Sequence, residues 1–197
     1  MGLQRSKVAA VDTDTLSEVR TSSGIFMPGA VDPLLASVEE RISRWTRLPV
    51  EHGEAFYFLQ YEVNQQYQPH HDTFDPTQPG MDRYLGACTA TLHALHFSCC
   101  SLAHSPTRSL PWFDASAGQR YATVVIYLGT PEEGGETTFP RINAAVPAVK
   151  GDAILFWSLH PDLQLNPNAM HGSNKVVRGT KYAAAKWIRV NPTYRGA

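Results

Sequence analysis

The sequence predicts a mainly β fold with one supporting helix, of the antiparallel sandwich or jelly-roll kind. Four stretches have the length of strands, are rich in β-branched or aromatic residues and are bounded by glycine, proline or asparagine: "EAFYFLQYEV", "QRYATVVIYLG", "AVKGDAILFWSL" and "YAAAKWIRV". Several strands after one strong helix favour packed sheets with the helix in support. At 197 residues the chain fits a single domain, 1–197, with a core of its own.

The helix is predicted in "VDPLLASVEERISRWTRLP", residues 31–49. Asp32 is a suitable N-cap, Pro33 suits the first helical position, and Pro49 ends the pattern. Apolar residues recur along one stripe, which we expect to face the core: Leu35, Val38, Ile42, Trp45 and Leu48.

Composition excludes several classes of protein. The formal net charge is -1 and 18% of residues are charged, so the chain resembles neither a disordered protein nor a nucleic-acid binder. No apolar run reaches the length of a membrane span and the N-terminus lacks the apolar core of a signal peptide, so we expect a soluble chain. The opening "MGLQRS" matches the myristoylation pattern at Gly2 and Ser6, a match that is common by chance.

Residues 84–116 do not fit the strand pattern. This segment holds all three cysteines, which form no zinc or disulfide pattern, and shows no sustained period of 2 or 3.6. A structureless stretch of this length inside a compact domain indicates function, disorder or an insertion. His93 and His96 could bind a metal together if the segment were helical, but incidental histidines in an insert are the favoured interpretation.

The stretch "YQPHHDTF" carries the first sign of a metal site. In a strand, His70 and Asp72 point to one face and His71 points to the other. A neutral imidazole and a carboxylate suit Fe(II), and two histidines with one carboxylate leave coordination positions open for substrate and oxygen. The pattern therefore predicts a site at His70 and Asp72 that needs one more histidine.

The residues alone do not select that third ligand. His52 lies in the turn-like "EHGE", His160 precedes Pro161, and His171 lies in "NAMHGSNK" ahead of the last predicted strand. The sequence alone does not decide between His160 and His171. Ten residues beyond His171 comes Lys181, whose burial beside a metal would require an anionic partner such as a dicarboxylate cosubstrate.

Six quoted motifs, in this order, carry a family resemblance: "SEVRTSSGIFM", "LQYEVNQQYQPHHDTF", "GQRYATVVIYL", "EEGGETTFP", "VKGDAILFWSL" and "MHGSNKVVRGTKYAAAKWI". Over residues 17–192 the chain resembles the prolyl 4-hydroxylases, especially the small plant and algal members. These are Fe(II)- and 2-oxoglutarate-dependent dioxygenases, and the resemblance implies a double-stranded β-helix, or jelly roll.

The resemblance also implies roles for individual residues. The iron ligands it implies are His70, Asp72 and His171, which decides against His160. It also implies that Lys181 binds the distal carboxylate of 2-oxoglutarate, with Tyr61 and Thr137 as further contacts. The residues implied for the peptide groove are Tyr67, Arg120 and Trp187, with Arg20 and Ser22 in a loop that folds over the peptide.

For two other residues the ordinary structural interpretation is kept. Tyr127 is expected to be a core aromatic residue of the sandwich. Lys186 lies five residues past Lys181, and so on the opposite face of a regular strand, where we expect an outward or rim charge.

The chain departs from the family pattern in three places. Arg189 stands where the family usually has a histidine, so one peptide contact is expected to change. Only about sixteen residues precede "SEVRTSSG", where the family has a further strand and helix. These N-terminal elements therefore look missing, and an edge of the core is expected to be uncovered. Most of residues 84–116 looks like an insertion that could obstruct the peptide groove.

The expected activity is hydroxylation of peptidyl proline to 4-hydroxyproline, with release of succinate and CO2. It uses Fe(II), 2-oxoglutarate and O2, with ascorbate to rescue oxidised iron, and a proline-rich peptide as substrate. Family resemblance places it in the endoplasmic reticulum. The main alternative is a catalytically impaired module of the same fold that binds peptide or metal. A zinc hydrolase would need a carboxylate to activate water, and Glu136 is the only suitable one.

Overall fold

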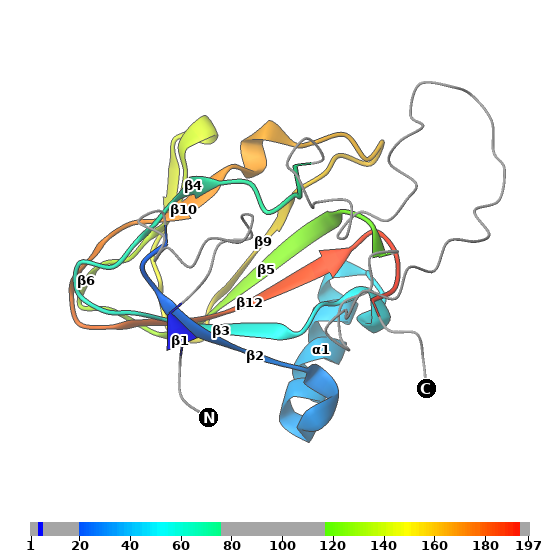
Figure 1. Ribbon diagram of the computed structural model, residues 1–197, viewed down its shortest axis with the longest axis horizontal. Helices are drawn as coiled ribbons and strands as arrows, with labels where there is room; N and C mark the ends of the chain where they lie inside the picture. Colours follow the sequence, from blue (N-terminus) through cyan, green and yellow to red (C-terminus); the bar gives the residue numbers. More distant parts are fainter. Residues whose placement is uncertain (1–3, 6–19, 76–116, 194–197) are drawn as a thin grey trace, which may run out of the picture.

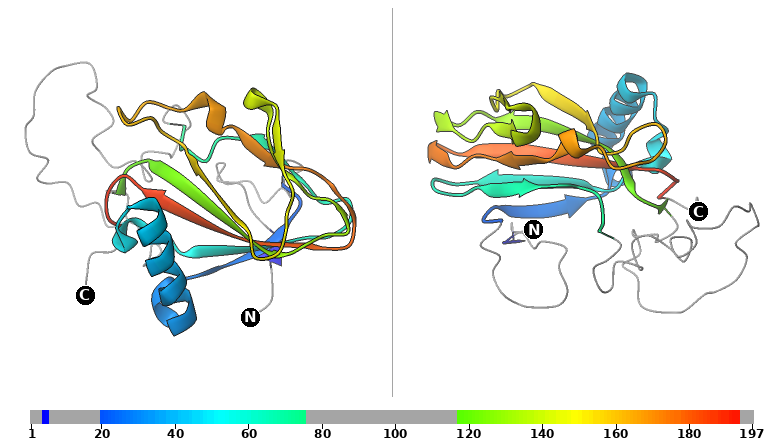
Figure 2. Two further views of the ribbon diagram at one scale, coloured as in Figure 1. Left: turned by 180° about the vertical axis from the view of Figure 1, so that it is seen from behind. Right: turned by 90° about the horizontal axis from the view of Figure 1, so that it is seen from above.

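Two antiparallel sheets face each other, and one helix supports the outer side of the larger sheet (Figures 1 and 2). The computed structural model describes residues 4–5, 20–75 and 117–193. Among these residues the larger sheet has the strand order β1-β2-β3-β12-β5-β9, the facing sheet has the order β4-β10-β7-β8, and β11 pairs with β6. The predicted jelly roll is confirmed.

The strands of the larger sheet are β1 (Gln4–Arg5), β2 (Ser23–Met27), β3 (Phe56–Tyr61), β5 (Arg120–Gly129), β9 (Ala153–Trp157) and β12 (Lys181–Arg189). The other strands are β4 (Tyr67–His70), β6 (Glu133–Gly134), β7 (Thr137–Phe139), β8 (Ala144–Val146), β10 (His171–Ser173) and β11 (Val176–Arg178). The helix α1 spans Pro33–Thr46, and short 3-10 turns span Gly29–Val31, Val50–His52, Pro140–Ile142 and Pro167–Ala169.

Each of the four predicted strand segments contains a strand. The third, residues 148–159, is shorter than expected because its first part is a turn around Gly151, whose positive φ of 98° suits glycine. Beyond β3 the sheet continues through β2 and then β1, which pairs with β2 at Ser23 and Gly24.

The helix α1 begins as the sequence predicts. The Asp32 side chain accepts a hydrogen bond from the Leu34 backbone N–H at 2.7 Å, and Pro33 occupies the first helical position. The helix ends at Arg47, which adopts a left-handed conformation at φ 63°. The cap and the proline therefore account for where α1 begins.

The apolar face of α1 packs on the outer face of the larger sheet. Ile42 belongs to a buried cluster with Phe56, Ala122, Val124, Ala184 and Ile188, and Leu35, Val38 and Leu48 pack against it. Trp45 does not: its side chain is 51% exposed, so its assignment to the core stripe was wrong. Positions 39 and 46 are buried instead, which shows that the buried face is rotated away from Trp45.

Strand β12 places side chains on both faces of the larger sheet. Its residues pair with β3 on one side and β5 on the other, from Lys181 opposite Tyr61 to Ala185 opposite both Tyr57 and Val125. Because side chains alternate along a strand, Lys181 and Ala185 face the smaller sheet, whereas Ala184 faces α1.

Lys186 lies on the predicted face but is not a rim charge. It is only 2% exposed and forms an ion pair with Glu39 of α1, and its ammonium also donates to the backbone carbonyl of Glu54. Burial lowers the pKa of Lys186, and the Glu39 carboxylate opposes this effect. The expectation of an outward charge was wrong because α1 covers this part of the sheet, which strand alternation alone does not reveal.

Several expectations concern other parts of the chain. The predicted insertion at 84–116, its cysteines, the His93 and His96 pair and the pattern at Gly2 and Ser6 lie outside the described residues. Among the described residues, no helix has the length and apolar character needed to cross a membrane.

The buried pair predicts how stability responds to substitution. Lys186→Met should lower the free energy of unfolding by about 3–5 kcal/mol, because the Glu39 carboxylate would stay buried without its cation. The double variant with Glu39→Leu should recover most of this loss, since it leaves no buried charge. Denaturant unfolding measures both values.

Lys150→Met is the matched control, since Lys150 is exposed, and it should change the unfolding free energy by no more than about 0.5 kcal/mol. If the single and double Lys186 variants lost the same free energy of unfolding, the loss could not be assigned to an unpaired Glu39 carboxylate.

Candidate metal centre

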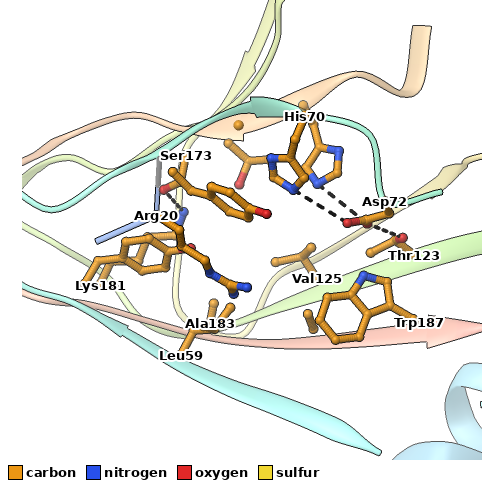
Figure 3. A pocket seen from close by; sticks show the side chains of 16 residues that line it. Arg20, Leu59, His70, Asp72, Thr123, Val125, Ser173, Lys181, Ala183 and Trp187 are labelled. Atoms are coloured by element: carbon orange, nitrogen blue, oxygen red, sulfur yellow. Dashed lines mark hydrogen bonds and ion pairs between the residues drawn. The ribbon is translucent and has the colours of Figure 1, made fainter. Parts of the chain in front are cut away.

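A pocket opens between the two sheets and receives side chains from both (Figure 3). Strand β12 contributes Lys181, Ala183, Ala185 and Trp187 to its floor. The opposite wall comes from the smaller sheet: β4, β7 and β10 contribute His70, Thr137, His171, Gly172 and Ser173. The pocket thus has a polar wall with two imidazoles, and a floor of small and aromatic residues that also carries Lys181.

His70, Asp72 and His171 converge at one end of this pocket. One nitrogen or oxygen atom of each lies within 4.8 Å of the others. The Nε2 atoms of His70 and His171 lie 3.6 Å from Asp72 Oδ1 and Oδ2, respectively. The pairing of β10 with β4 sets His171 directly opposite His70, which brings together ligands a hundred residues apart in the chain.

Both imidazoles are oriented by backbone hydrogen bonds. His70 Nδ1 donates to the Gln68 carbonyl at 2.8 Å, and His171 Nδ1 donates to the Ala169 carbonyl at 3.0 Å. A carbonyl can only accept, so Nδ1 carries the proton and the lone pair of each neutral ring is on Nε2, the atom turned toward Asp72. This second hydrogen bond is the usual support of a metal-binding histidine.

Asp72 is buried and held in place by Thr123, whose hydroxyl donates to Asp72 Oδ2 at 2.6 Å. Burial alone would raise the pKa of Asp72, but the neighbouring His171 and His70 outweigh burial and hold it well below its usual range. Burial lowers the pKa of His171 to about 4, against the opposing effect of Asp72. At neutral pH the cluster therefore offers a carboxylate and a neutral imidazole, the donor set that Fe(II) accepts.

His171, the third ligand that the resemblance implied, lies in the cluster, and the other candidate histidines lie outside it. His160 is exposed on the surface, and His52 Nδ1 lies 3.0 Å from the Arg189 carbonyl. His71 is not among the three residues whose donor atoms lie close enough to hold one metal ion. Strand β4 ends at His70, so Asp72 reaches the site from the bend that follows rather than by regular strand alternation.

Lys181 lies in the same pocket and is only 2% exposed. Its Nζ donates to Ser173 Oγ at 2.9 Å and lies 5.3 Å from the centre of the Tyr61 ring. Burial lowers the pKa of Lys181 to about 8, and Glu136 opposes this shift. No carboxylate in the described residues forms an ion pair with Lys181, so the pocket holds a buried cation suited to an anionic ligand.

Ser173 was not singled out from the sequence. It lies two residues after His171 on β10, on the same side of the strand, and its side chain lines the pocket. The spacing of a serine two residues from a metal-binding histidine was the available signal.

Tyr61 and Thr137 also line the pocket, as expected. Burial raises the pKa of Tyr61, so its hydroxyl stays protonated and can donate. Tyr127 is fully buried in a cluster with Ala148 and Ala183, as predicted for a core aromatic residue, but its hydroxyl also donates to Thr137 Oγ1 at 2.8 Å.

Arg20 and Tyr67 form a second polar edge of the pocket. The Arg20 guanidinium points into the pocket, 4.6 Å from the centre of the Tyr67 ring, and its Nε donates to Ser22 Oγ at 3.2 Å (Figure 3). Burial raises the pKa of Tyr67 to about 12. A backbone bridge joins Arg20 to Tyr67, so the segment before β2 lies against β4.

Trp187 lines the floor of the pocket, but Arg120 does not belong to the lining residues. The Arg120 guanidinium lies 3.8 Å from the centre of the Trp187 ring and forms two hydrogen bonds of 2.8 Å with the Glu54 carboxylate. Arg189, where the family pattern has a histidine, is 1% exposed and donates to Glu54 Oε1 at 3.0 Å. Glu54 thus pairs with both arginines, next to Trp187.

Glu136 is poorly placed to activate a metal-bound water. Its Oε2 accepts a hydrogen bond from Asn174 at 3.1 Å, and the residue is not part of the pocket lining. Glu136 therefore does not supply the water-activating carboxylate that a zinc hydrolase would require at this site.

Comparison with known proteins agrees with this geometry. Residues 56–189 match the family model described as the 2OG-Fe(II) oxygenase superfamily. A protein named probable prolyl 4-hydroxylase 10, from Arabidopsis thaliana, is 39% identical over 196 residues, which covers 90% of this chain and 56% of the relative. The chain therefore spans little more than half the length of this relative.

Two solved structures share the fold. The viral collagen prolyl hydroxylase of Paramecium Bursaria Chlorella virus-1, solved with 2OG, aligns with a TM-score of 0.60 and 23% identity, covering 87% of this chain and 80% of the viral chain. A prolyl hydroxylase from Trichoplax adhaerens, in complex with a peptide fragment of the hypoxia inducible factor, aligns with a TM-score of 0.55 and 15% identity over 95% and 70% of the two chains.

The geometry predicts which residues control metal affinity. His70→Ala should abolish tight binding of Fe(II) or Co(II) because it removes one Nε2 donor, whereas His71→Ala should bind like the unaltered chain. Thr123→Val should weaken binding by about 10- to 100-fold, since it removes the hydroxyl that holds Asp72. Titration under anaerobic conditions measures these affinities, and a larger loss for His71→Ala than for His70→Ala would refute the assignment.

Proposed function

Because the chain belongs to the 2OG-Fe(II) oxygenase superfamily, we propose that it is a dioxygenase that hydroxylates peptidyl proline to 4-hydroxyproline. The observation that carries this proposal is the combination, in one pocket, of the cluster of His70, Asp72 and His171 with the buried cation of Lys181. A metal at one end and a cation at the other match the two ends of 2-oxoglutarate.

His70, Asp72 and His171 would hold the iron through two Nε2 atoms and one carboxylate oxygen. The fit rests on the converging donor atoms, on the Nδ1 hydrogen bonds that leave both Nε2 lone pairs available, and on the charge of Asp72. Bound iron would supply the chemistry of O2, by which 2-oxoglutarate is split to succinate and CO2 while one oxygen atom enters the proline.

Lys181 would pair with the distal carboxylate of 2-oxoglutarate. Because Lys181 is buried, a bound anion would stabilise its charge, since a charge removed from water needs a close partner of opposite sign. Ser173, Tyr61 and Thr137 bring hydroxyl groups to the same part of the pocket and can complete the hydrogen bonds of that carboxylate. The small side chains of Ala183 and Ala185 leave room on the floor.

The protein's own residues position and enclose rather than transfer protons. The substrate hydrogen leaves as part of the oxidation, so no side-chain general base is required. This agrees with a pocket in which the ionisable groups serve as metal ligands, as a carboxylate anchor or as groove residues. The task of these residues is therefore to position the cosubstrate and the peptide in the pocket and to exclude water from it.

A proline-rich peptide is the proposed substrate. Tyr67 and Arg20 give the pocket an aromatic and cationic edge, and Trp187 adds an aromatic ring on its floor; such aromatic surfaces suit the extended polyproline II conformation. Family resemblance adds two residues that contact this groove from behind its lining: Arg120, whose guanidinium lies on the Trp187 ring, and Ser22, which accepts a hydrogen bond from Arg20. Ascorbate as the reductant and the endoplasmic reticulum as the compartment complete the proposal, and both rest on family resemblance.

Activity is tested by incubation with Fe(II), 2-oxoglutarate, ascorbate and a proline-rich peptide. We expect peptide-dependent succinate and 4-hydroxyproline in equal amounts, and a loss of more than about a hundredfold in Asp72→Ala because a charged iron ligand is removed. Lys150→Met, an exposed substitution, is the control. Peptide binding without succinate would support the catalytically impaired module instead.

Cosubstrate affinity should depend on pH through Lys181. Its pKa of about 8 means that the free protein carries the charge below this pH and loses it above. The affinity for 2-oxoglutarate should therefore be retained at lower pH and fall by up to about tenfold per pH unit above 8. Binding measured by calorimetry over this range gives the profile.

Lys181→Met should bind 2-oxoglutarate weakly and without the decline above pH 8, because the titrating ammonium is gone. Lys175→Met, at an exposed position, should keep the profile of the unaltered chain. An identical decline in Lys181→Met would show that another group causes it.

A further inference from the structure

A row of stacked side chains leads from the candidate metal centre to the outer part of the larger sheet. The ring of Tyr67 stacks on His70 at 3.6 Å, and the Arg20 guanidinium lies 4.6 Å from Tyr67 and 4.7 Å from Tyr57. Phe26 continues the row, with its ring 4.2 Å from that of Tyr57 at an interplanar angle of 18°. Four contacts thus connect His70 to Phe26.

The register of the sheet builds the outer end of this row. Phe26 of β2 lies directly opposite Tyr57 of β3, so both side chains are on the same face, the face that carries the pocket. Gly24 leaves the room that the Tyr57 ring occupies, because a Cβ there would lie 2.7 Å from Tyr57 Cζ and 2.8 Å from the Phe58 carbonyl oxygen. The position of the ring is therefore fixed by backbone as well as by stacking.

Phe26 is the exposed end of a row whose other rings are buried or half-buried. Its side chain is 50% exposed, whereas Tyr57 is 4% exposed. Tyr57 also stacks on Trp187, whose ring centre lies 5.9 Å away, so the row and the pocket floor are continuous. A large aromatic ring with one face stacked and the other open to solvent, next to a pocket, is a suitable surface for an apolar ligand.

Trp187 indicates where such a ligand would pass. Its indole Nε1 is buried and has no hydrogen-bond acceptor within the described part of the chain, which costs about 1–3 kcal/mol unless a ligand supplies one. Figure 3 shows this indole on the floor of the pocket, across from His70 and Asp72. A backbone carbonyl of an extended peptide is an acceptor that could reach it.

We propose that Phe26 forms an outer subsite for the proline-rich substrate. A proline ring distant from the reacting residue would pack on the open face of Phe26 while the reacting proline lies beside the metal centre. The inference rests on the proposed function and extends it by a residue outside the pocket. Phe26 contributes affinity for long substrates and takes no part in the reaction.

The length of the row limits how far that distant proline lies from the reacting residue. With contacts of 3.6 to 4.7 Å, the path from His70 to Phe26 is at most about 17 Å, which corresponds to about five residues of a polyproline II chain at about 3.1 Å per residue. Proline-rich segments dock in aromatic-lined grooves in this conformation because it is formed before binding. A substrate that spans this path can lie beside the metal centre and contact Phe26 at the same time.

The test compares short and long proline-rich peptides, with about two and about eight residues on each side of the reacting proline. Phe26→Ala should raise the KM of the long peptide about 2- to 12-fold, the range of one aromatic stacking contact, and should leave kcat and the KM of the short peptide unchanged. Phe26→Tyr should behave like the unaltered chain, because it keeps the ring.

Tyr182→Ala is the matched control: Tyr182 is 43% exposed but follows Lys181 on β12 and so lies on the opposite face of the same sheet. Equal effects of Phe26→Ala on both peptides, or none on either, would overturn the outer subsite.

Calorimetric titration of the same peptides separates this inference from the proposed reaction. If the unaltered chain turned over no peptide, the proposed function would fail, yet weaker binding of the long peptide alone in Phe26→Ala would still support the subsite. Binding that does not depend on peptide length or on Phe26 would overturn it.

Discussion

The alternation of side chains along β12 is the constraint on which the rest of the structure depends. One strand supplies Lys181 and Trp187 to the pocket and Lys186 to the helix side, because successive residues face opposite sides of the sheet. A shift of one residue in its pairing with β3 or β5 would exchange the two sets, bury the wrong cation in the pocket and separate Lys181 from Tyr61. Pairing on both edges fixes the register.

The buried charges are stabilised in different ways, and the difference distinguishes charges that stabilise the fold from one that is suited to bind a ligand. Lys186 has Glu39 as a partner within the protein, and Glu54 pairs with both Arg120 and Arg189. Lys181 has only the hydroxyl of Ser173 within hydrogen-bonding distance among the described residues, together with a lowered pKa. A cation that is paired internally holds the fold together, whereas one left to a hydroxyl is suited to an anionic ligand.

Local rules predicted much of this molecule from its sequence. The cap at Asp32 and the four strand segments follow from short-range patterns, and the structure bears them out. His70 and Asp72 also lie together as predicted, but Asp72 does so from a bend after β4 and not by strand alternation. The choice of His171 needed the family resemblance, because the pairing of β10 with β4 is a contact between distant segments that spacing does not encode. The error at Lys186 has the same cause: alternation gives a face, but only the packing of α1 shows that the face is covered.

The central claim is that His70, Asp72 and His171 bind one metal ion through both Nε2 atoms and the carboxylate, with Lys181 at the far end of the bound cosubstrate. A crystal structure grown anaerobically with Mn(II) and 2-oxoglutarate tests it most directly, since anomalous scattering locates the metal. The account predicts one peak bonded to these three residues and a carboxylate of 2-oxoglutarate beside Lys181 Nζ. A peak at other residues, or a cosubstrate carboxylate that does not approach Lys181, would contradict it.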